Sequence, residues 1–434
     1  MQAGDRIQLQ YHDEMLDGVL MPSTDEHIIV LKLDNGYNIG LKKRDVASMT
    51  VLGKAPTEKQ TFPNQERTDL PVVSILHTGG TIASKVDYTT GGVSSRFSPE
   101  ELLELFPELG SIASIRSRLI ANMWSQDLRF GHYNKLAEEV KKELAEGVQG
   151  IIITHGTDTM HYTAAALSFI LENIPVPVVL VGSQRSSDRG SSDAGMNLLN
   201  AVFFAAHANF SGVVICMHHS SNDDGCAILP GTKTKKMHSS RRDAFKAINA
   251  QPVAFVNHGT KTITFNSTHY LQRHDGKINL KLIDGNIKVG VLKQHTHMHA
   301  EEFLFYKDYD GLVIESTGLG NLPITAFDEL TKEHEHIMLA LQKLIHQGVI
   351  IVLSPETIFG RLNLNVYENA RRQQQAGILG HNNDMTTETT FIKLAWLLSN
   401  YDKQQAKDLL LKNLRGELAE RTSYTDDFLQ DDAS

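Results

Sequence analysis

The stretch LHTGGTIAS, residues 76–84, determines how the rest of this chain is interpreted. It follows a short apolar run, residues 71–76, that is rich in β-branched residues and predicts a buried strand. Two glycines then allow a sharp turn, and Thr78 and Thr81 flank them. A hydroxyl on the loop after a parallel strand lies where open α/β sheets bind ligands. The alternative is an ordinary glycine turn with incidental threonines, and this stretch alone favours neither interpretation.

A second stretch, IIITHGTDTM at residues 151–160, repeats the same layout of an apolar run, a glycine and then hydroxyl and carboxylate side chains. We expect a helix from Asp158 or Thr159 to about Glu172. Thr157 and Asp158 would then lie at a helix N-terminus, where backbone N–H groups favour negative charge. The alternative for Asp158 is a plain N-cap.

Together, the strings TGGTIAS and THGTDTM resemble the asparaginase/glutaminase family of threonine amidohydrolases. The resemblance covers residues 70 to about 400 and implies a pair of α/β lobes with mostly parallel sheets. It matches Thr81 to the nucleophile of the first motif. It matches Thr157, Asp158 and Lys236 to the second threonine and its activating pair. Which threonine attacks the substrate stays open, because spacing does not distinguish them.

The lysine candidates lie in the run GTKTKKMHSSRRDAF, residues 231–245. On composition alone this run is typical of a basic, solvated surface. The resemblance points instead to Lys236 as the catalytic lysine, with Lys235 as an adjacent rival. Lys233 is expected to be one charge on a solvated face. A lysine can deprotonate a threonine hydroxyl only if it gives up its own proton at the working pH.

The resemblance also implies residues that bind the substrate. Tyr88 falls where relatives carry a tyrosine on a mobile lid, here residues 85–97, whose glycines suit a loop that opens and closes. Ser125 and Gln126 match the pair that holds the α-carboxylate, and Asp158 would also face the α-amino group. An ordinary helix cap is the alternative for Ser125.

Composition sets broad limits on the class of protein. The chain has 434 residues, which suggests two or three domains, and 41% hydrophobic residues, enough for sizeable cores. A net charge of −9 argues against counterion-driven binding to nucleic acid by this chain alone. Two cysteines, no signal-peptide pattern and no apolar run near 18 residues predict a soluble cytoplasmic protein.

The pattern along the chain predicts an α/β protein with a small N-terminal β-barrel. Residues 1–53 contain alternating strand candidates at 6–11, 16–21, 27–33 and 37–41, with a hairpin turn signal at 34–36, and predict a five-stranded SH3-like barrel. A polar linker follows at residues 54–69. Strands alternate with helices in an N-lobe at 70–257 and a C-lobe at 287–434. We expect hairpins at 258–286, a helix at 385–399 and a frayed acidic end from residue 422.

Three histidines at alternate positions, His295, His297 and His299, precede Glu301 and Glu302. Such a set could ligate zinc. The histidines follow a predicted strand, in a loop where alternation no longer keeps them on one face. We therefore expect no metal here, and zinc remains the alternative.

Four segments, GDR at 4–6, LDNGYNIG at 33–40, KMHSSRRDAF at 236–245 and GRLN at 360–363, resemble the family of asparaginase-like subunits of archaeal-type glutamyl-tRNA(Gln) amidotransferases. This resemblance implies a glutaminase that passes ammonia to a partner amidotransferase subunit, which amidates Glu-tRNA(Gln) with ATP and magnesium. It implies a homodimer core within a heterotetramer, no cofactor in this chain, and a tRNA held mainly by the partner. A stand-alone asparaginase is the alternative function, and a binding protein that has lost catalysis is a third.

Overall fold

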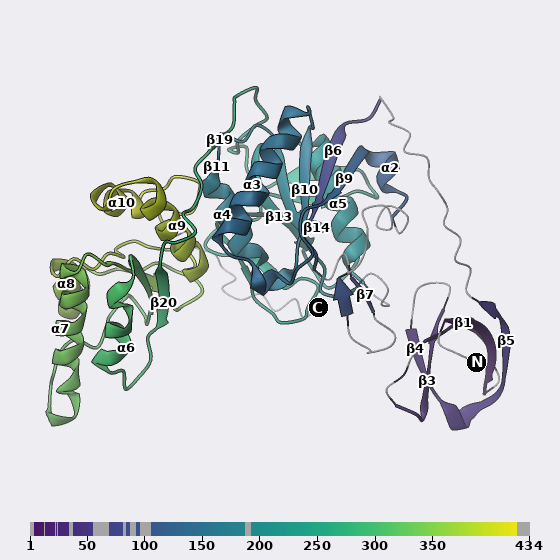
Figure 1. Cartoon of the computed structure of the whole chain (residues 1–434), viewed down its shortest axis with the longest axis horizontal. Helices are drawn as coiled ribbons and strands as arrows, with labels where there is room; N and C mark the ends of the chain where they lie inside the picture. The colour runs from purple at the N-terminus through teal and green to yellow at the C-terminus, as the bar shows by residue number, and fades with distance from the viewer. Residues whose placement is uncertain are drawn as a thin grey trace.

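A computed structural model gives the fold of the chain (Figure 1). It describes residues 4–12, 14–21, 23, 25–33, 38–54, 69–80, 84–86, 93–95, 106–186 and 192–422. The linker predicted at 54–69 and the turn at 34–36 therefore lie mostly or wholly outside the described residues, as does the acidic end from residue 423. The chain forms an antiparallel β domain and then two α/β lobes, which confirms the predicted fold class.

The N-terminal domain is a five-stranded antiparallel sheet in the order β4-β3-β2-β1-β5. Its strands are β1 (Asp5–Tyr11), β2 (Glu14–Met21), β3 (Ile28–Lys32), β4 (Asn38–Lys42) and β5 (Val46–Lys54), with a short 3-10 helix at Lys43–Asp45. Alternation buries Ile7, Leu9 and Leu31 on one face of the sheet. The pairing of β1 with β5 shifts register at two points, and such irregularities bend and twist a sheet.

The N-lobe is built on an eight-stranded sheet in the order β18-β17-β14-β13-β12-β10-β6-β9. Five neighbouring strands are parallel: β9 (Ser114–Leu119), β6 (Val72–His77), β10 (Gly150–Thr154), β12 (Pro177–Val181) and β13 (Gly212–His218). The antiparallel strands β14 (Cys226–Pro230), β17 (Ala254–Asn257) and β18 (Thr262–Phe265) extend one edge. The central parallel strands are buried along their whole length, as expected for a sheet covered on both faces.

Helices cover both faces of this sheet (Figure 1). One apolar core contains residues of α3 (Phe130–Ala145) and α4 (Met160–Ile170), and the other contains residues of α2 (Leu109–Ile112) and α5 (Ala194–His207). The helix expected to run to Glu172 stops at Ile170. The next two residues form β11 (Leu171–Glu172), because their backbone pairs with β19 (Asn279–Leu280) from far along the chain.

The segment between the lobes, all of it within the described residues, forms one hairpin at its start and not the series of hairpins expected. Its first part, β18, pairs with β17 and so completes the edge of the large sheet. Its later turn signals, at residues 275–276 and 284–285, do not join strands that pair with each other: β19 between them pairs with β11, and β20 after them pairs with β21. The physical reason is that a turn signal fixes only a local reversal of the chain. It does not supply a neighbouring strand.

The C-lobe has a three-stranded parallel sheet, in the order β20-β21-β22, with helices packed around it. Its elements are β20 (Val289–Lys293), α6 (Ala300–Leu304), β21 (Gly311–Ser316), α7 (Glu333–His346), β22 (Ile350–Pro355), α8 (Glu368–Gln375), α9 (Thr387–Asn400) and α10 (Lys403–Leu410). Helix α9 buries Ile392, Trp396 and the leucines Leu394 and Leu397, as its sequence pattern predicts, while Leu398 is partly buried. The Trp396 ring stacks on Phe169 of α4, with ring centroids 5.4 Å apart, so α9 belongs to the apolar core of both lobes.

Residues after α10 return to the body of the protein. The carboxylate of Glu417 lies 2.5 Å from the Lys393 ammonium of α9, and both side chains are fully buried. Arg415 donates a hydrogen bond to Glu172 at 3.0 Å, and the backbone N–H of Ala419 donates to Asp384. Among the described helices, none has the length and apolar character that crossing a bilayer requires.

Candidate active site

The two glycine turns predicted from sequence lie against each other at the carboxyl ends of β6 and β10. These strands are parallel neighbours, with His77 opposite Thr154. A Cβ atom on Gly80 would lie 2.4 Å from the backbone nitrogen of Gly156, and Gly80 also has a φ of +85°. Only glycine meets both conditions without displacing the neighbouring turn. The strand ends therefore bring the first and second motifs into direct contact.

Two of the predicted residues, Thr81 and Tyr88, lie outside the described residues. Thr81 follows Gly80 directly in the sequence. The two ends of the predicted lid pair as short antiparallel strands, β7 (Ser84–Val86) and β8 (Val93–Ser95). The assignments of Thr81 and Tyr88 thus remain predictions.

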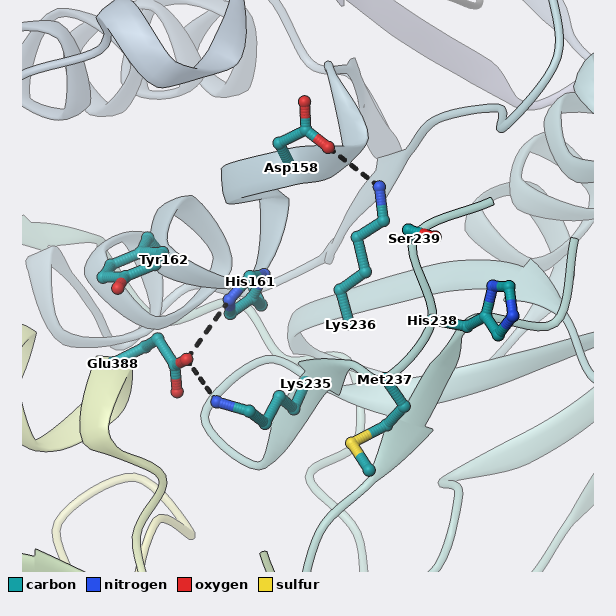
Figure 2. Close-up of a pocket in the computed structure, with 9 residues that line it drawn as sticks. All are labelled: Asp158, His161, Tyr162, Lys235, Lys236, Met237, His238, Ser239 and Glu388. Atoms are coloured by element: carbon teal, nitrogen blue, oxygen red, sulfur yellow. Dashed lines mark hydrogen bonds and ion pairs between the residues drawn. The ribbon is translucent and has the colours of Figure 1, made fainter. Parts of the chain in front are cut away.

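The second motif meets the lysine run in a compact constellation. Thr157 is buried and opens the 3-10 helix Thr157–Thr159, which leads into α4. Lys236 closes β15 (Thr234–Lys236), which pairs with β16 (Phe245–Ala247). The Lys236 ammonium donates to the Thr157 hydroxyl at 2.9 Å and to the Asp158 carboxylate at 2.9 Å, and Figure 2 shows the second of these contacts. A hydroxyl, a carboxylate and a lysine predicted from distant stretches therefore meet at one point.

The chemistry available to this set follows from its geometry. The Lys236 side chain is 11% exposed, whereas the Asp158 side chain is 70% exposed and borders solvent. A lysine nitrogen at hydrogen-bond distance from a threonine oxygen can accept the proton of that hydroxyl once the lysine is neutral. The adjacent carboxylate then stabilises the ammonium that forms. The arrangement could activate the Thr157 hydroxyl as a nucleophile, or it could relay a proton from another nucleophilic hydroxyl beside it.

The neighbouring lysine faces a different partner. Successive side chains of a strand point to opposite sides. Lys235 accordingly turns away and donates a hydrogen bond to Glu388 of α9 (Figure 2). Of the two rivals, the structure brings Lys236 to Thr157 and Asp158.

The expectation for Lys233 was wrong. Its side chain is 5% exposed and forms an ion pair with Asp384 at 3.0 Å. Burial lowers the pKa of Lys233, and the charge of Asp384 opposes that effect. Charge density alone favours a solvated run, but Lys233, directly before β15, faces a carboxylate of the C-lobe.

Ser125 is the member of the predicted substrate pair that the structure places beside the second motif. It is buried at the start of a 3-10 helix, Ser125–Asp127, while Gln126 is exposed. A Cβ atom on Gly156 would lie 2.9 Å from the Ser125 hydroxyl oxygen, and Thr159 donates to the Ser125 carbonyl at 2.6 Å. The cap position of this helix belongs to Trp124, without a side-chain cap hydrogen bond, so the helix-cap alternative for Ser125 is not observed.

A cavity of about 450 Å³ borders Lys236 on the side of the C-lobe. It is lined by Asp158, His161, Tyr162, Lys235, Lys236, Met237, His238, Ser239 and Glu388, all drawn in Figure 2. Glu388 is the member from the C-lobe. Burial alone would raise the pKa of Glu388, but its contacts with His161 and Lys235 hold that pKa well below its usual range.

Sequence reasoning missed Glu388 and His161. An acidic residue in the first turn of a helix is usually explained by the helix dipole, and Glu388 occupies that position in α9. His161 lies in the first turn of α4 and gives no separate signal. No local pattern could have indicated that these two side chains meet the lysine run.

The rings of His297 and His299 lie 4.9 Å apart, but within the described residues the three histidines do not form one group of candidate zinc ligands. Glu302 accepts from the His295 ring at 3.0 Å and from the backbone N–H of His299 at 2.8 Å, which caps the start of α6. His297 has a φ of +64°, which turns the chain between them. Within the described residues, His299, Glu301 and Glu333 could bring ligand atoms within 4.8 Å of one another, but Glu333 already accepts from the Ala300 N–H.

Known families match nearly the whole chain in three consecutive parts. The GatD N-terminal domain matches residues 1–52, the asparaginase N-terminal family matches 72–270, and the glutaminase/asparaginase C-terminal domain matches 288–410. The GatD subunit of glutamyl-tRNA(Gln) amidotransferase from Methanococcus maripaludis is 40% identical over 427 residues, covering 97% of this chain and 99% of the relative. The corresponding amidotransferase subunit of Pyrococcus furiosus is 40% identical over 420 residues, covering 94% of this chain and 91% of the relative.

Solved structures match the two lobes. The thermostable L-asparaginase from Thermococcus kodakarensis has a TM-score of 0.69 and 28% identity, covering 80% of this chain and 99% of that one. L-asparaginase I from Vibrio cholerae has a TM-score of 0.68 and 25% identity, covering 81% of this chain and 99% of that one. The asparaginase structures thus account for most of the chain but not all of it.

Proposed function

Since this chain belongs to the GatD family of glutamyl-tRNA(Gln) amidotransferase subunits, we propose that it is the glutaminase component of such an enzyme. It hydrolyses glutamine to glutamate and ammonia. The ammonia is used by the partner subunit, GatE, to convert Glu-tRNA(Gln) to Gln-tRNA(Gln), with ATP and magnesium bound by that partner. The single observation that carries this proposal is the Lys236 ammonium held between Thr157 and Asp158, in a chain whose N-terminal domain matches that of GatD.

The residues take the following parts in the proposed reaction. A threonine hydroxyl, of Thr81 or Thr157, attacks the carboxamide carbon while Lys236 takes the hydroxyl proton and Asp158 stabilises the resulting ammonium. The tetrahedral intermediate expels ammonia after the leaving nitrogen receives a proton, and water then releases glutamate from the acyl-enzyme. Tyr88 covers the substrate from the lid. Ser125 and Gln126 hold its α-carboxylate, and Asp158 faces its α-amino group.

The basic run does not offer a surface for a polyanion. Lys235 binds Glu388, Arg241 pairs with Asp243 at 2.8 Å, and Arg242 pairs with Asp223 at 2.6 Å. Cations that already have carboxylate partners release few counterions from a phosphate backbone. We therefore place most tRNA recognition on GatE, in a heterotetramer with a homodimer core of this chain. Because its substrate would be Glu-tRNA(Gln), the complex would act in the cytoplasm, together with the translation machinery.

The test is glutamine turnover by this chain alone, with GatE, and with GatE plus Glu-tRNA(Gln). We expect slow hydrolysis by the isolated chain and faster hydrolysis in the full complex, because the lid at residues 85–97 must close before reaction. Formation of Gln-tRNA(Gln) should require this chain when glutamine is the nitrogen donor. When ammonium chloride is the nitrogen donor, GatE should form Gln-tRNA(Gln) without this chain.

A stand-alone asparaginase is the second candidate, because solved asparaginases match both lobes over nearly their whole length. It is distinguished by substrate preference. Faster hydrolysis of asparagine than of glutamine, at full rate without any partner, would support this second function and overturn the first.

A further inference from the structure

Glu388 contacts both chain segments that carry the proposed catalytic side chains. Its Oε1 accepts the hydrogen bond of Lys235, the residue next to Lys236 in β15. The same oxygen lies 3.8 Å from Nε2 of His161, in the first turn of α4, four residues after Thr157. Figure 2 shows Glu388 between these two partners, on a helix of the other lobe. One carboxylate of the C-lobe thus joins the lysine strand to the helix that follows the threonine.

We propose that Glu388 is a positioning residue that holds Lys236 at hydrogen-bond distance from Thr157. The proposal rests on the function assigned above to Lys236 and Thr157. Glu388 acts through its two partners: Lys235 fixes the strand next to Lys236, and His161 fixes the start of α4.

The lysine strand needs such support. It belongs to a ribbon of only two short strands, β15 and β16, and a two-stranded ribbon is marginally stable by itself. Residues of the same C-lobe segment fix the chain that leads into it. Thr389 donates to the carbonyl of Thr232 at 2.9 Å, and Asp384 pairs with Lys233 at 3.0 Å. Glu388 adds a third contact, to Lys235, which is the contacted residue nearest in sequence to Lys236.

The chemistry of Glu388 also indicates more than a packing role. Its side chain is 12% exposed, and its Oε2 is buried without a hydrogen-bond partner in the described structure. A buried carboxylate with one oxygen unpaired costs stability, which a well-packed apolar residue would avoid. Such a group is understandable if its charge places the Lys235 ammonium and the His161 ring.

The experiment replaces Glu388 and measures glutamine turnover in the complex with GatE. We expect Glu388→Gln to lower kcat about 10- to 100-fold, because a displacement near 1 Å at a reacting group has effects of that size. The KM for glutamine should stay within about twofold, since Glu388 does not touch the substrate. Lys235→Met should reproduce the loss, Lys235→Arg should restore most of it, and the double variant Lys235→Met/Glu388→Gln should be no worse than the poorer single variant.

Glu172→Gln is the matched control. Glu172 lies just beyond the other end of α4, where it pairs with Arg415 at 3.0 Å and Lys281 at 3.6 Å. It therefore also joins the lobes through two cations, but far along the helix from Thr157. We expect Glu172→Gln to lower the unfolding temperature and to leave kcat unchanged.

The outcomes separate this inference from the proposed function. If Lys236→Met is inactive but Glu388→Gln keeps the wild-type kcat, the positioning role is wrong and the proposed function stands. If Lys236→Met retains activity, the proposed assignment of the lysine fails first. Equal losses of kcat in Glu388→Gln and Glu172→Gln would show a general effect of lobe packing and would overturn the inference. Should Glu388→Gln not fold, the two Lys235 variants decide in the same way.

Discussion

The two lobes use the carboxyl ends of their parallel strands in different ways. In the N-lobe, β6 and β10 end in glycine turns, and the Thr157 hydroxyl beyond β10 receives a hydrogen bond from a lysine. In the C-lobe, Ser316 ends β21, and Ser354 is the residue before the last of β22. Ser316 donates to the carbonyl of Ser354 at 3.1 Å, and the Ser354 hydroxyl bonds Thr387 at 3.0 Å. Both sheets bring hydroxyl groups to the same kind of edge. In the N-lobe the Thr157 hydroxyl contacts a lysine, whereas in the C-lobe the Thr387 hydroxyl donates to the Glu315 carboxylate at 3.2 Å.

The charged residues of the two edges differ in the same way. Lys293 at the end of β20 lies 3.6 Å from Glu315 and 3.1 Å from Glu356, all within the C-lobe. Lys236 is instead placed by a strand outside the main sheet and points back at it. The fold therefore supplies a position for chemistry at every strand end. Whether chemistry occurs there depends on a side chain brought from another part of the chain.

The largest expected effect is on the N-lobe edge. Thr157→Val should reduce glutamine turnover by roughly 10³-fold or more, because it removes the hydroxyl that Lys236 contacts. The free energy of unfolding should change by no more than about 1 kcal/mol, since a methyl group replaces the hydroxyl at similar volume. Steady-state kinetics and thermal unfolding of the variant check both values. Thr81→Val should behave alike by sequence, and wild-type turnover in both would contradict the assignment.

A second variant tests how differently neighbouring lysines act. Lys233→Met should destabilise the fold by about 3–5 kcal/mol, because it leaves the buried Asp384 carboxylate without its ammonium. Denaturant titration measures this loss. The double variant Lys233→Met/Asp384→Asn should recover part of it by removing the unpaired charge. A loss below about 1 kcal/mol would show that this ion pair is not what holds the run to the C-lobe.

The next effect is a pH dependence of N-lobe stability. His155 is fully buried between Thr163 and Gly156, and burial lowers its pKa to about 4 from 6.5. The unfolded chain therefore takes up this proton at a higher pH than the folded chain does. The contribution of neutral His155 to the free energy of unfolding is complete above pH 6.5. It is lost as the pH falls from 6.5 to 4, by about 3 kcal/mol in total. As the pH is lowered across this range, the free energy of unfolding should fall less steeply for His155→Gln than for the wild type. Identical slopes for the two proteins would refute the prediction.

The smallest effect belongs to the C-lobe edge. Ser354→Ala should cost about 1 kcal/mol of stability, the usual worth of one hydrogen bond, and leave kcat unchanged. Calorimetry and kinetics on one preparation measure both quantities. A large fall in kcat would mean that the two edges are not as different as their contacts indicate.

Much of the fold follows from local sequence patterns. The apolar runs at 71–76 and 151–153 form β6 and β10, and α9 buries Ile392 and Trp396 as its periodicity predicts. Elements whose formation depends on a distant partner were not predicted. Residues 171–172 leave the helix for a strand because residues 279–280 lie alongside them, and helix periodicity carries no information about such a partner.

The candidate site divides along the same line. Thr157, Asp158 and Lys236 were identified because a resemblance links motifs that are 79 residues apart, and the structure places them in contact. The contact between Lys235 and Glu388 spans 153 residues, and no motif links the lysine run to Glu388. The solvated interpretation of Lys233 failed because charge density in a sequence does not reveal which cations meet a buried carboxylate.

The buried pair of Lys393 and Glu417 has a consequence for dividing this protein into modules. The asparaginase-type C-terminal match ends at residue 410, but the counter-ion of Lys393 lies seven residues later. A protein cut at that boundary would leave an ammonium inside an apolar helix interface with no carboxylate to balance it. Arg361 also donates hydrogen bonds to the carbonyls of Ala419 and Glu420. Transplanting this lobe, or fusing another protein at its end, therefore requires a junction beyond residue 422, so that these contacts are kept. The structural unit of this lobe is therefore longer than the segment that matches the family by sequence.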